Sequence, residues 1–155
     1  MQLTRHTDYA LRVLIFLALQ KEQELVTMAD IERHFGIPRN HLIKIVQRLG
    51  KLGYAKTVRG KGGGVRLGRE MAAIRLGEVV WDMENTLELI DCHKPVCPIR
   101  VACRLKPILD EARQAFLDVL NRHTLADVMR DPGMLETALN WPAPLSPSRP
   151  VRSPK

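Results

Sequence analysis

The sequence predicts a mainly α (α+β) chain in which several helices accompany one small two-stranded hairpin. Two segments with helical periodicity meet at a short glycine turn between Thr27 and Leu49. A glycine-rich segment with two short flanking strands follows, and a long segment with helical periodicity comes late, from Leu105 to Asn121. At 155 residues the chain is long enough to bury a hydrophobic core of its own.

Basic charge is concentrated in the first half of the chain. Residues 1–80 hold 14 Lys and Arg against 7 Asp and Glu, whereas residues 81–139 hold 7 against 10. This asymmetry favours a polyanionic partner, although a solvated basic surface explains it equally well. The longest apolar run, Val13–Leu19, is too short to cross a bilayer and no leader sequence is recognisable. We therefore expect a cytoplasmic protein that does not bind membranes.

The first helix is predicted to begin near Thr7. Thr4 or Thr7 can cap its start, because a hydroxyl oxygen accepts an otherwise unpaired backbone N–H. Asp8 then lies in the first turn, where the helix dipole favours a carboxylate. The apolar positions that recur on one face are Leu11, Leu14, Ile15 and Ala18.

Two helices joined by a glycine turn are predicted from Thr27 onward. Thr27 and Asp30 have the spacing of a capping box, and Gly36 can end the first helix in a left-handed conformation. Pro38 suits the first turn of the second helix. The apolar stripe of that helix is Leu42, Ile45, Val46 and Leu49. This layout is typical of helix-turn-helix DNA-binding proteins.

The side chains outside that stripe are of the types that bind bases and phosphates. They are Arg39, Asn40, His41, Lys44 and Arg48. A polar outer face is also what any solvated helix presents. We predict that these residues contact DNA, together with Thr27 at the start of the preceding helix.

The next segment predicts a hairpin with a basic, glycine-rich tip. Tyr54–Val58 and Val65–Leu67 are the expected strands, and four glycines fall within residues 60–64. Arg59 and Lys61 supply positive charge, and either can enter a minor groove. A nucleotide-binding loop is the rival interpretation. However, the segment contains neither G-x-x-x-x-G-K-[ST] nor a G-x-G-x-x-G that follows a strand, the two motifs of phosphate-binding loops. The hairpin is therefore predicted to be the wing of a winged helix that binds double-stranded DNA.

Two further helices are predicted in the second half. The first begins near Ile74, and its inward-facing residues are Leu76, Val79, Val80 and Met83. The second, Leu105 to Asn121, has an apolar face broad enough to pair with a second copy, although it can instead pack onto its own domain. A short capped helix from Thr124 is expected after it. Five prolines among residues 140–155 predict a disordered tail.

All three cysteines of the chain lie within twelve residues, between these two helices. Cys92, Cys97 and Cys103 have the spacing C-x4-C-x5-C. A thiolate group of this kind is typical of an iron–sulfur centre or a soft metal. Zinc, a thiol redox switch and three unrelated cysteines remain open. Because no constellation of catalytic side chains is present, we do not expect an enzyme.

These observations predict four parts. Residues 1–80 form a winged helix-turn-helix DNA-binding domain, and residues 81–104 form a helix and a cluster-binding loop. Residues 105–139 form a long dimerisation helix and a short C-terminal helix, and residues 140–155 form the tail.

Four motifs occur in order along residues 1 to about 130. They are Met1-Gln-Leu-Thr-x-x-Thr-Asp-Tyr-Ala-Leu-Arg, Pro38-Arg-Asn-His-Leu-x-Lys-Ile, Val58-Arg-Gly-Lys-x-Gly-Gly and the cysteine motif. With them the chain resembles the bacterial iron–sulfur winged-helix regulators, in particular their nitric-oxide-sensing branch. The resemblance implies a homodimeric repressor whose affinity for its DNA operator is set by an iron–sulfur cluster that reacts with nitric oxide.

The resemblance also implies a set of ligands. The three cysteines match those that hold the cluster, and Asp8 of the other subunit matches the fourth ligand of a [4Fe–4S] cluster, which is favoured over [2Fe–2S]. Another branch has a histidine where this chain has Lys106, which cannot bind iron while protonated. Asp8 thus has two interpretations, helix cap and ligand, and Arg12 is expected to orient its carboxylate. The alternative is a regulator whose cysteines form a [2Fe–2S], zinc or thiol switch that senses iron–sulfur or oxidative status.

Overall fold

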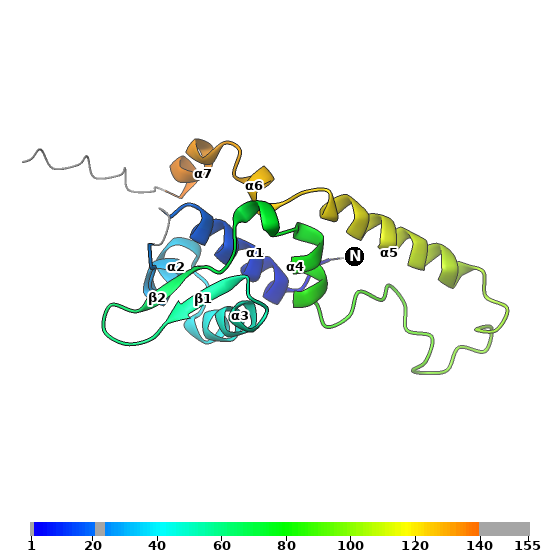
Figure 1. Ribbon diagram of the computed structural model, residues 1–155. Coiled ribbons are helices and arrows are strands. Elements are labelled where there is room, and N and C mark those ends of the chain that lie inside the picture. Colours follow the sequence, from blue (N-terminus) through cyan, green and yellow to red (C-terminus); the bar gives the residue numbers. More distant parts are fainter. Residues whose placement is uncertain (1, 21–23, 140–155) are drawn as a thin grey trace, which may run out of the picture.

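The computed structural model describes residues 2–20 and 24–139, so the predicted tail lies outside the described residues. The elements, in chain order, are α1 Arg5–Ala18, α2 Met28–Phe35, α3 Arg39–Lys51, β1 Ala55–Val58, β2 Gly64–Leu67, η1 Met71–Ala73, α4 Leu76–Met83, α5 Leu105–Asn121, α6 Leu125–Val128 and α7 Pro132–Ala138. The predicted fold class is confirmed, with helices around one two-stranded antiparallel sheet. Figure 1 shows two regions, which we call the head (α1 to α4 with α6 and α7) and the arm (residues 85–104 and α5).

The helix α1 lies at the centre of the head, where it contacts α2, α3, α4, α6 and β2. The hydroxyl of Thr4 accepts the N–H of Thr7 at 3.3 Å, so the helix begins at Arg5, earlier than predicted. Of the four predicted apolar positions only Leu14 is fully buried, and the other three are partly buried. The other buried positions are Thr7, Ala10, Val13, Phe16 and Leu17. Because α1 is covered on several sides, its burial is wider than the single predicted stripe.

The helix-turn-helix forms as predicted. The hydroxyl of Thr27 accepts the N–H of Asp30 at 3.2 Å, and the carboxylate of Asp30 accepts the N–H of Thr27 at 3.0 Å. These two hydrogen bonds complete the capping box. Gly36 ends α2 with φ of 62°, a conformation that glycine adopts at little cost. All four residues of the predicted α3 stripe are buried.

The wing is the antiparallel pair of β1 and β2, in which Ala55 lies opposite Leu67 and Val58 opposite Gly64. Its turn requires glycine at Gly63, because a Cβ there would lie 2.3 Å from the carbonyl oxygen of Val58. A β-bridge between Val65 and Val26 joins the wing to the segment just before α2. The base of the wing is thus fixed to the head.

The chain returns to the head after α5. The N–H of Leu125 donates to the carbonyl of Ile74 at 2.8 Å, and the N–H of Leu76 donates to the carbonyl of His123 at 3.0 Å. Leu125 is 1% exposed and belongs to the same core as α1 and α3. The predicted segment 105–139 is therefore divided between the arm and the head.

The helix α5 has the predicted bounds and projects away from the head in Figure 1. It packs against α4, but Leu117 is the one fully buried residue of this completely described helix. Its large apolar side chains Leu105, Ile108 and Val119 are 56%, 60% and 46% exposed. Within the described ranges, no helix has the length and hydropathy needed to cross a membrane.

Candidate DNA interface and cluster-binding loop

The first turn and a half of α3 exposes the polar side chains that the sequence predicts as DNA contacts. Arg39, Asn40, His41 and Lys44 are all exposed. The amide oxygen of Asn40 accepts the N–H of His41 at 2.9 Å, and the ring of His41 meets the edge of Tyr9 at 6.3 Å between centroids. The four side chains are thus accessible on the outer face of α3, although His41 also contacts Tyr9.

Two grooves flank this face. One, of about 270 Å³, brings Thr27 and Arg39 together with Val58 and Gly64 of the wing. The other, of about 390 Å³, lies along α3 and is lined by Lys44, Gln47, Arg48, Lys51 and Leu52. The predicted residues from α2, α3 and the wing base therefore share one side of the head. Gln47 and Lys51 were not predicted as DNA contacts. They become candidates because they line the same groove as Lys44 and Arg48.

The hydroxyl of Thr27 is already engaged in the structure. It donates to the carboxylate of Asp30 at 2.7 Å and accepts the N–H of the same residue. The hydrogen bond from Thr27 lowers the pKa of Asp30 below its ordinary value. Thr27 therefore has a structural role as helix cap, and its contact with DNA stays a prediction.

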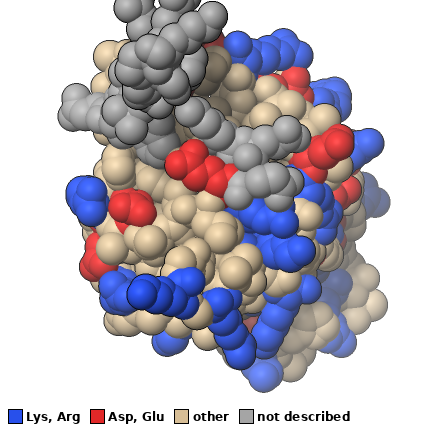
Figure 2. Space-filling view, turned by 60° about the vertical axis from the view of Figure 1, so that its left-hand side comes forward, with Lys and Arg blue, Asp and Glu red and all other residues tan. Residues whose placement is uncertain are grey.

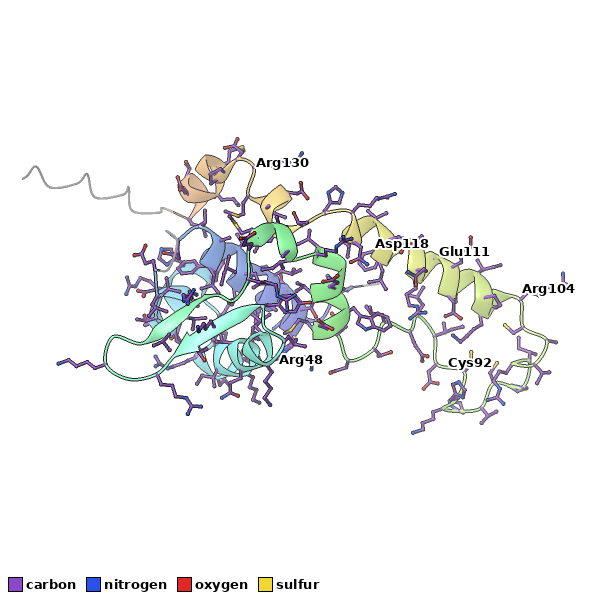
Figure 3. The ribbon with its side chains drawn as sticks, in the orientation of Figure 1. Arg48, Cys92, Arg104, Glu111, Asp118 and Arg130 are labelled. Atoms are coloured by element: carbon purple, nitrogen blue, oxygen red, sulfur yellow. The ribbon has the colours of Figure 1, made fainter. Side chains whose placement is uncertain are left out.

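Arg48 makes a contact within the head that sequence reasoning missed. Its Nε donates to the main-chain carbonyl of Asp82 at 3.0 Å, and its Nη2 donates to the same oxygen. Figure 3 shows Arg48 on the lower side of the head, near α3 and α4. This guanidinium holds α3 to the end of α4, and its predicted contact with DNA stays a prediction.

The wing carries the predicted basic residues and two that were missed. Arg59 and Lys61 are exposed at its tip. Lys56 and Arg66 lie directly opposite each other in the ladder, so two positive side chains share one face. Like charges placed opposite each other are unfavourable by roughly 0.2–1 kcal/mol, which favours a polyanionic partner for this face. The register, which the sequence predicts only approximately, was needed to find this pair.

The space-filling view toward the wing side shows the charge distribution of the head. In Figure 2 Lys and Arg side chains make up most of the charged surface along the lower part of the face, and several Asp and Glu side chains lie above them. The lower part of this face is thus mostly positive, which suits contact with the phosphate backbone of DNA.

The three cysteines lie on the arm, between α4 and α5 (Figure 3). All three thiols are free; Cys92 is 6% exposed, and Cys97 and Cys103 are partly buried. Within the described residues, no three His, Cys, Asp or Glu side chains lie close enough together to hold a metal ion. The donors have the right chemistry for an iron–sulfur cluster. A cluster held by all three requires the loop to bring them closer together.

Local hydrogen bonds shape this loop. The carboxylate of Asp91 accepts the N–H of His93 at 2.7 Å and that of Lys94 at 3.2 Å, and the bond from His93 is the first reason that the pKa of Asp91 is lowered. The N–H of Cys97 donates to the carbonyl of Cys92 at 3.2 Å. The partners in each of these hydrogen bonds lie within five residues, and Nη1 of Arg100 lies 3.3 Å from Nδ1 of His93, seven residues away, so the described hydrogen bonds of the loop are local.

Lys106 is held in its charged form. Its ammonium group donates to both carboxylate oxygens of Asp110, at 2.9 and 3.0 Å. This hydrogen bonding to Asp110 raises the pKa of Lys106 above its ordinary value. The structure thus supports the argument that Lys106 does not replace the histidine ligand of the other branch.

Asp8 and Arg12 form the pair that the sequence predicts. Arg12 donates from Nε to Oδ1 of Asp8 at 3.0 Å and from Nη2 to Oδ2 at 2.9 Å. Both side chains are about half exposed, so the carboxylate is oriented by Arg12 and still accessible from outside the chain. A fourth ligand supplied by Asp8 to a second subunit stays a prediction.

Comparison with known proteins identifies the family. A family model described as Rrf2, an iron-dependent transcriptional regulator, matches residues 3–131. The HTH-type transcriptional regulator NsrR of Bacillus subtilis (strain 168) is 45% identical over 134 residues, which cover 84% of this chain and 92% of that protein. NsrR of Geobacillus kaustophilus (strain HTA426) is 46% identical over 142 residues, covering 90% and 97%.

Solved structures share the fold. T. potens IscR matches with a TM-score of 0.70 at 23% identity, over 88% of this chain and 91% of that one. The oxidised form of Staphylococcus aureus CymR matches with a TM-score of 0.66 at 24% identity, over 84% and 97%. Because its relatives are named transcriptional regulators, the expectation that the chain is not an enzyme is confirmed. The chain belongs to the Rrf2 family of transcriptional regulators, and within that family it is of the NsrR type.

Proposed function

We propose that this regulator is a cytoplasmic homodimeric repressor whose operator affinity is set by an iron–sulfur cluster that reacts with nitric oxide. Cys92, Cys97 and Cys103 of one subunit hold the cluster, and Asp8 of the other subunit completes a [4Fe–4S] site. One observation carries the proposal. Three free thiols lie on a single loop outside the core of a DNA-binding head.

The loop suits this role because it is both rich in donors and weakly held. Residues 84–104, all of them described, contain turns and bends but neither helix nor strand. When bound, the cluster supplies irons that nitric oxide attacks. The thiolates hold it, and Arg12 keeps the carboxylate of Asp8 oriented for the partner's loop.

The DNA side of the proposal rests on the basic face of the head. The start of α3 is exposed and in this proposal enters the major groove, and the exposed Arg59 and Lys61 at the wing tip enter the adjacent minor groove. Lys56 and Arg66 are added as phosphate contacts. Each phosphate contact contributes about one unit to the slope of log affinity against log salt. Lys56→Ala is therefore expected to lower that slope by about one, in operator titrations from low to moderate salt.

The dimer is supported by the arm. Leu105, Ile108 and Val119 present an apolar face that the described part of this chain leaves uncovered. A two-fold dimer would cover it and would place two α3 helices for two half-sites.

The first test is an absorption spectrum of anaerobically purified protein, repeated during titration with nitric oxide. A broad brown band near roughly 400 nm that bleaches in parallel with loss of operator binding is the expected result. A reddish spectrum with several bands indicates [2Fe–2S], and a colourless protein that contains zinc or reversibly oxidised thiols indicates the alternative regulator. The reddish spectrum counts against Asp8 as a ligand, and the colourless protein removes the nitric-oxide mechanism.

A second test addresses Asp8. Asp8→Ala is expected to change the spectrum and the rate of reaction with nitric oxide, because an oxygen ligand is lost. Glu70→Ala, which removes an exposed acid elsewhere on the head, is the control. An Asp8→Ala protein with an unaltered spectrum and reaction rate leaves Asp8 as a helix-start residue only.

A further inference from the structure

Asp82, near the end of α4, makes hydrogen bonds both to α3 and to the residue before β1. Its main-chain carbonyl accepts Nε of Arg48 in α3 at 3.0 Å, with a second bond from Nη2. Its carboxylate accepts the hydroxyl of Tyr54, directly before β1, at 2.7 Å. Asp82 of α4 thus holds both α3 and the start of β1.

Glu84, two residues later, ties the same point to α1. Its carboxylate accepts the N–H of Thr4 at 2.8 Å and the hydroxyl of Thr4 at 3.1 Å. Glu84 is 8% exposed, and Thr4 is the cap that starts α1. Burying a carboxylate costs free energy unless donors satisfy its oxygens. The two hydrogen bonds from Thr4 supply such donors, and they fix Glu84 relative to the start of α1.

Asp82 and Glu84 lie where α4 ends and the segment toward the cysteines begins. The helix α4 ends at Met83, which is 1% exposed, and Glu84 begins the segment that leads to Cys92. The hydrogen bond between Tyr54 and Asp82 lies beside a groove of about 420 Å³, which Trp81 and Arg69 also line. Tyr54 and Asp82 both line this groove, so open space adjoins the hydrogen bond that joins them. Burial, and then the bond to Asp82, raises the pKa of the Tyr54 phenol, so the hydroxyl remains a donor at neutral pH.

We propose that residues 82–84 form a joint through which the conformation of the cysteine loop sets the positions of α3, the wing and α1 within the same chain. Asp82 and Glu84 are positioning residues that contact neither the cluster nor DNA. The coupling rests on the proposed function, but it follows a different route from Asp8, which acts between subunits. Two arrangements of the joint, each favoured by one loop conformation, give the head two DNA affinities.

The test measures coupling rather than affinity alone. The quantity is the ratio of operator dissociation constants for cluster-free and cluster-loaded protein. Tyr54→Phe removes one hydroxyl and keeps the buried ring, and it is expected to reduce the ratio by about fivefold with the cluster spectrum unchanged. Asp82→Ala is expected to give the same reduction. The double variant is expected to add nothing further, because both changes break one hydrogen bond.

Conservative variants supply the matched controls. Asp82→Asn keeps an oxygen that accepts from Tyr54, and Glu84→Gln keeps an oxygen that accepts from Thr4, so both are expected to retain most of the wild-type ratio. Glu84→Ala is expected to lower it. A ratio that stays at the wild-type value in Tyr54→Phe and Asp82→Ala, with fold and cluster intact, overturns the joint.

A second measurement separates this proposal from the proposed function. Hydrogen–deuterium exchange on cluster-free protein is expected to rise in β1 and in the last turns of α3 when Asp82 is changed to Ala. A wild-type protein that binds no cluster contradicts the proposed function, and the joint is then judged by exchange alone. Unchanged exchange in both elements rejects it.

Discussion

Similar fractions of the residues in the head and in the arm are apolar, yet these apolar residues lie in different environments. In the head, Ile31, Leu42 and Ile45 are 0% exposed. In the arm, Ile99 and Ile108 are 65% and 60% exposed, and Val101 is 96% exposed. The head therefore completes its core within one chain, whereas the arm leaves large apolar side chains exposed.

Polar contacts differ in the same way. In the head they join residues distant in sequence, such as Thr4 with Glu84 and Tyr54 with Asp82. Along residues 85–120 of the arm the hydrogen bonds that the structure shows are local, as between Asp91 and His93 or between Lys106 and Asp110. Long-range contacts fix the position of one element relative to another, and local contacts do not. The elements of the head are thus held relative to one another by polar contacts, whereas the described hydrogen bonds of the cysteine loop join only nearby residues.

The largest expected effect is on the arm. Cys92→Ser is expected to abolish cluster binding, because a hydroxyl is a poor ligand for iron in such centres. Iron content and absorbance of reconstituted protein measure it. The thermal unfolding of the head should stay close to that of wild type. Val101→Ser, at an exposed position in the same loop, is the control and should bind iron normally. Equal iron content in both variants would falsify the assignment of Cys92.

The next effect is on the head. Ile45→Ala is expected to lower the free energy of unfolding by about 2–5 kcal/mol, because it leaves a cavity in a close-packed core. Ile108→Ala removes the same atoms from an exposed site and is expected to cost far less at concentrations where the protein is monomeric. Urea denaturation measures both. Similar losses in the two variants would mean that the arm is as well packed as the head.

A smaller effect is expected on association. Ile108→Ser is expected to weaken self-association by roughly tenfold, because it places a polar group in the apolar face of α5. Analytical ultracentrifugation across a concentration series measures the dissociation constant. Met134→Ser, which changes a 75% exposed residue of α7, is the matched control. A wild-type protein that stays monomeric at every concentration contradicts the dimer itself.

The smallest effect is expected at the capping box. Thr27→Ala is expected to lower the free energy of unfolding by about 1 kcal/mol at pH 7. The pKa of Asp30 is lowered in the folded protein, so its contribution is complete above the ordinary carboxyl pKa and is lost as pH falls through the folded value. The difference between wild type and variant should therefore shrink below about pH 4. A difference that is constant down to pH 2 would show that the hydrogen bonds to Asp30 do not contribute.

Much of the secondary structure could be predicted from local sequence. The stripe of α3, the capping box at Thr27 and the bounds of α5 follow from periodicity and capping, which depend on residues a few positions apart. The residue types on the cysteine loop also indicated their chemistry directly. What failed was the burial of α1, where the predicted stripe included only Leu14 of the fully buried residues.

The sequence by itself determined which elements form, which residues carry charge and which side chains can bind iron, because these properties belong to single residues or to short spacings. Only the tertiary structure decided what joins them. It placed Lys56 opposite Arg66, tied Arg48 to Asp82 and brought Leu125 back into the core. Such contacts depend on strand register and on the packing of distant segments, which no local pattern encodes.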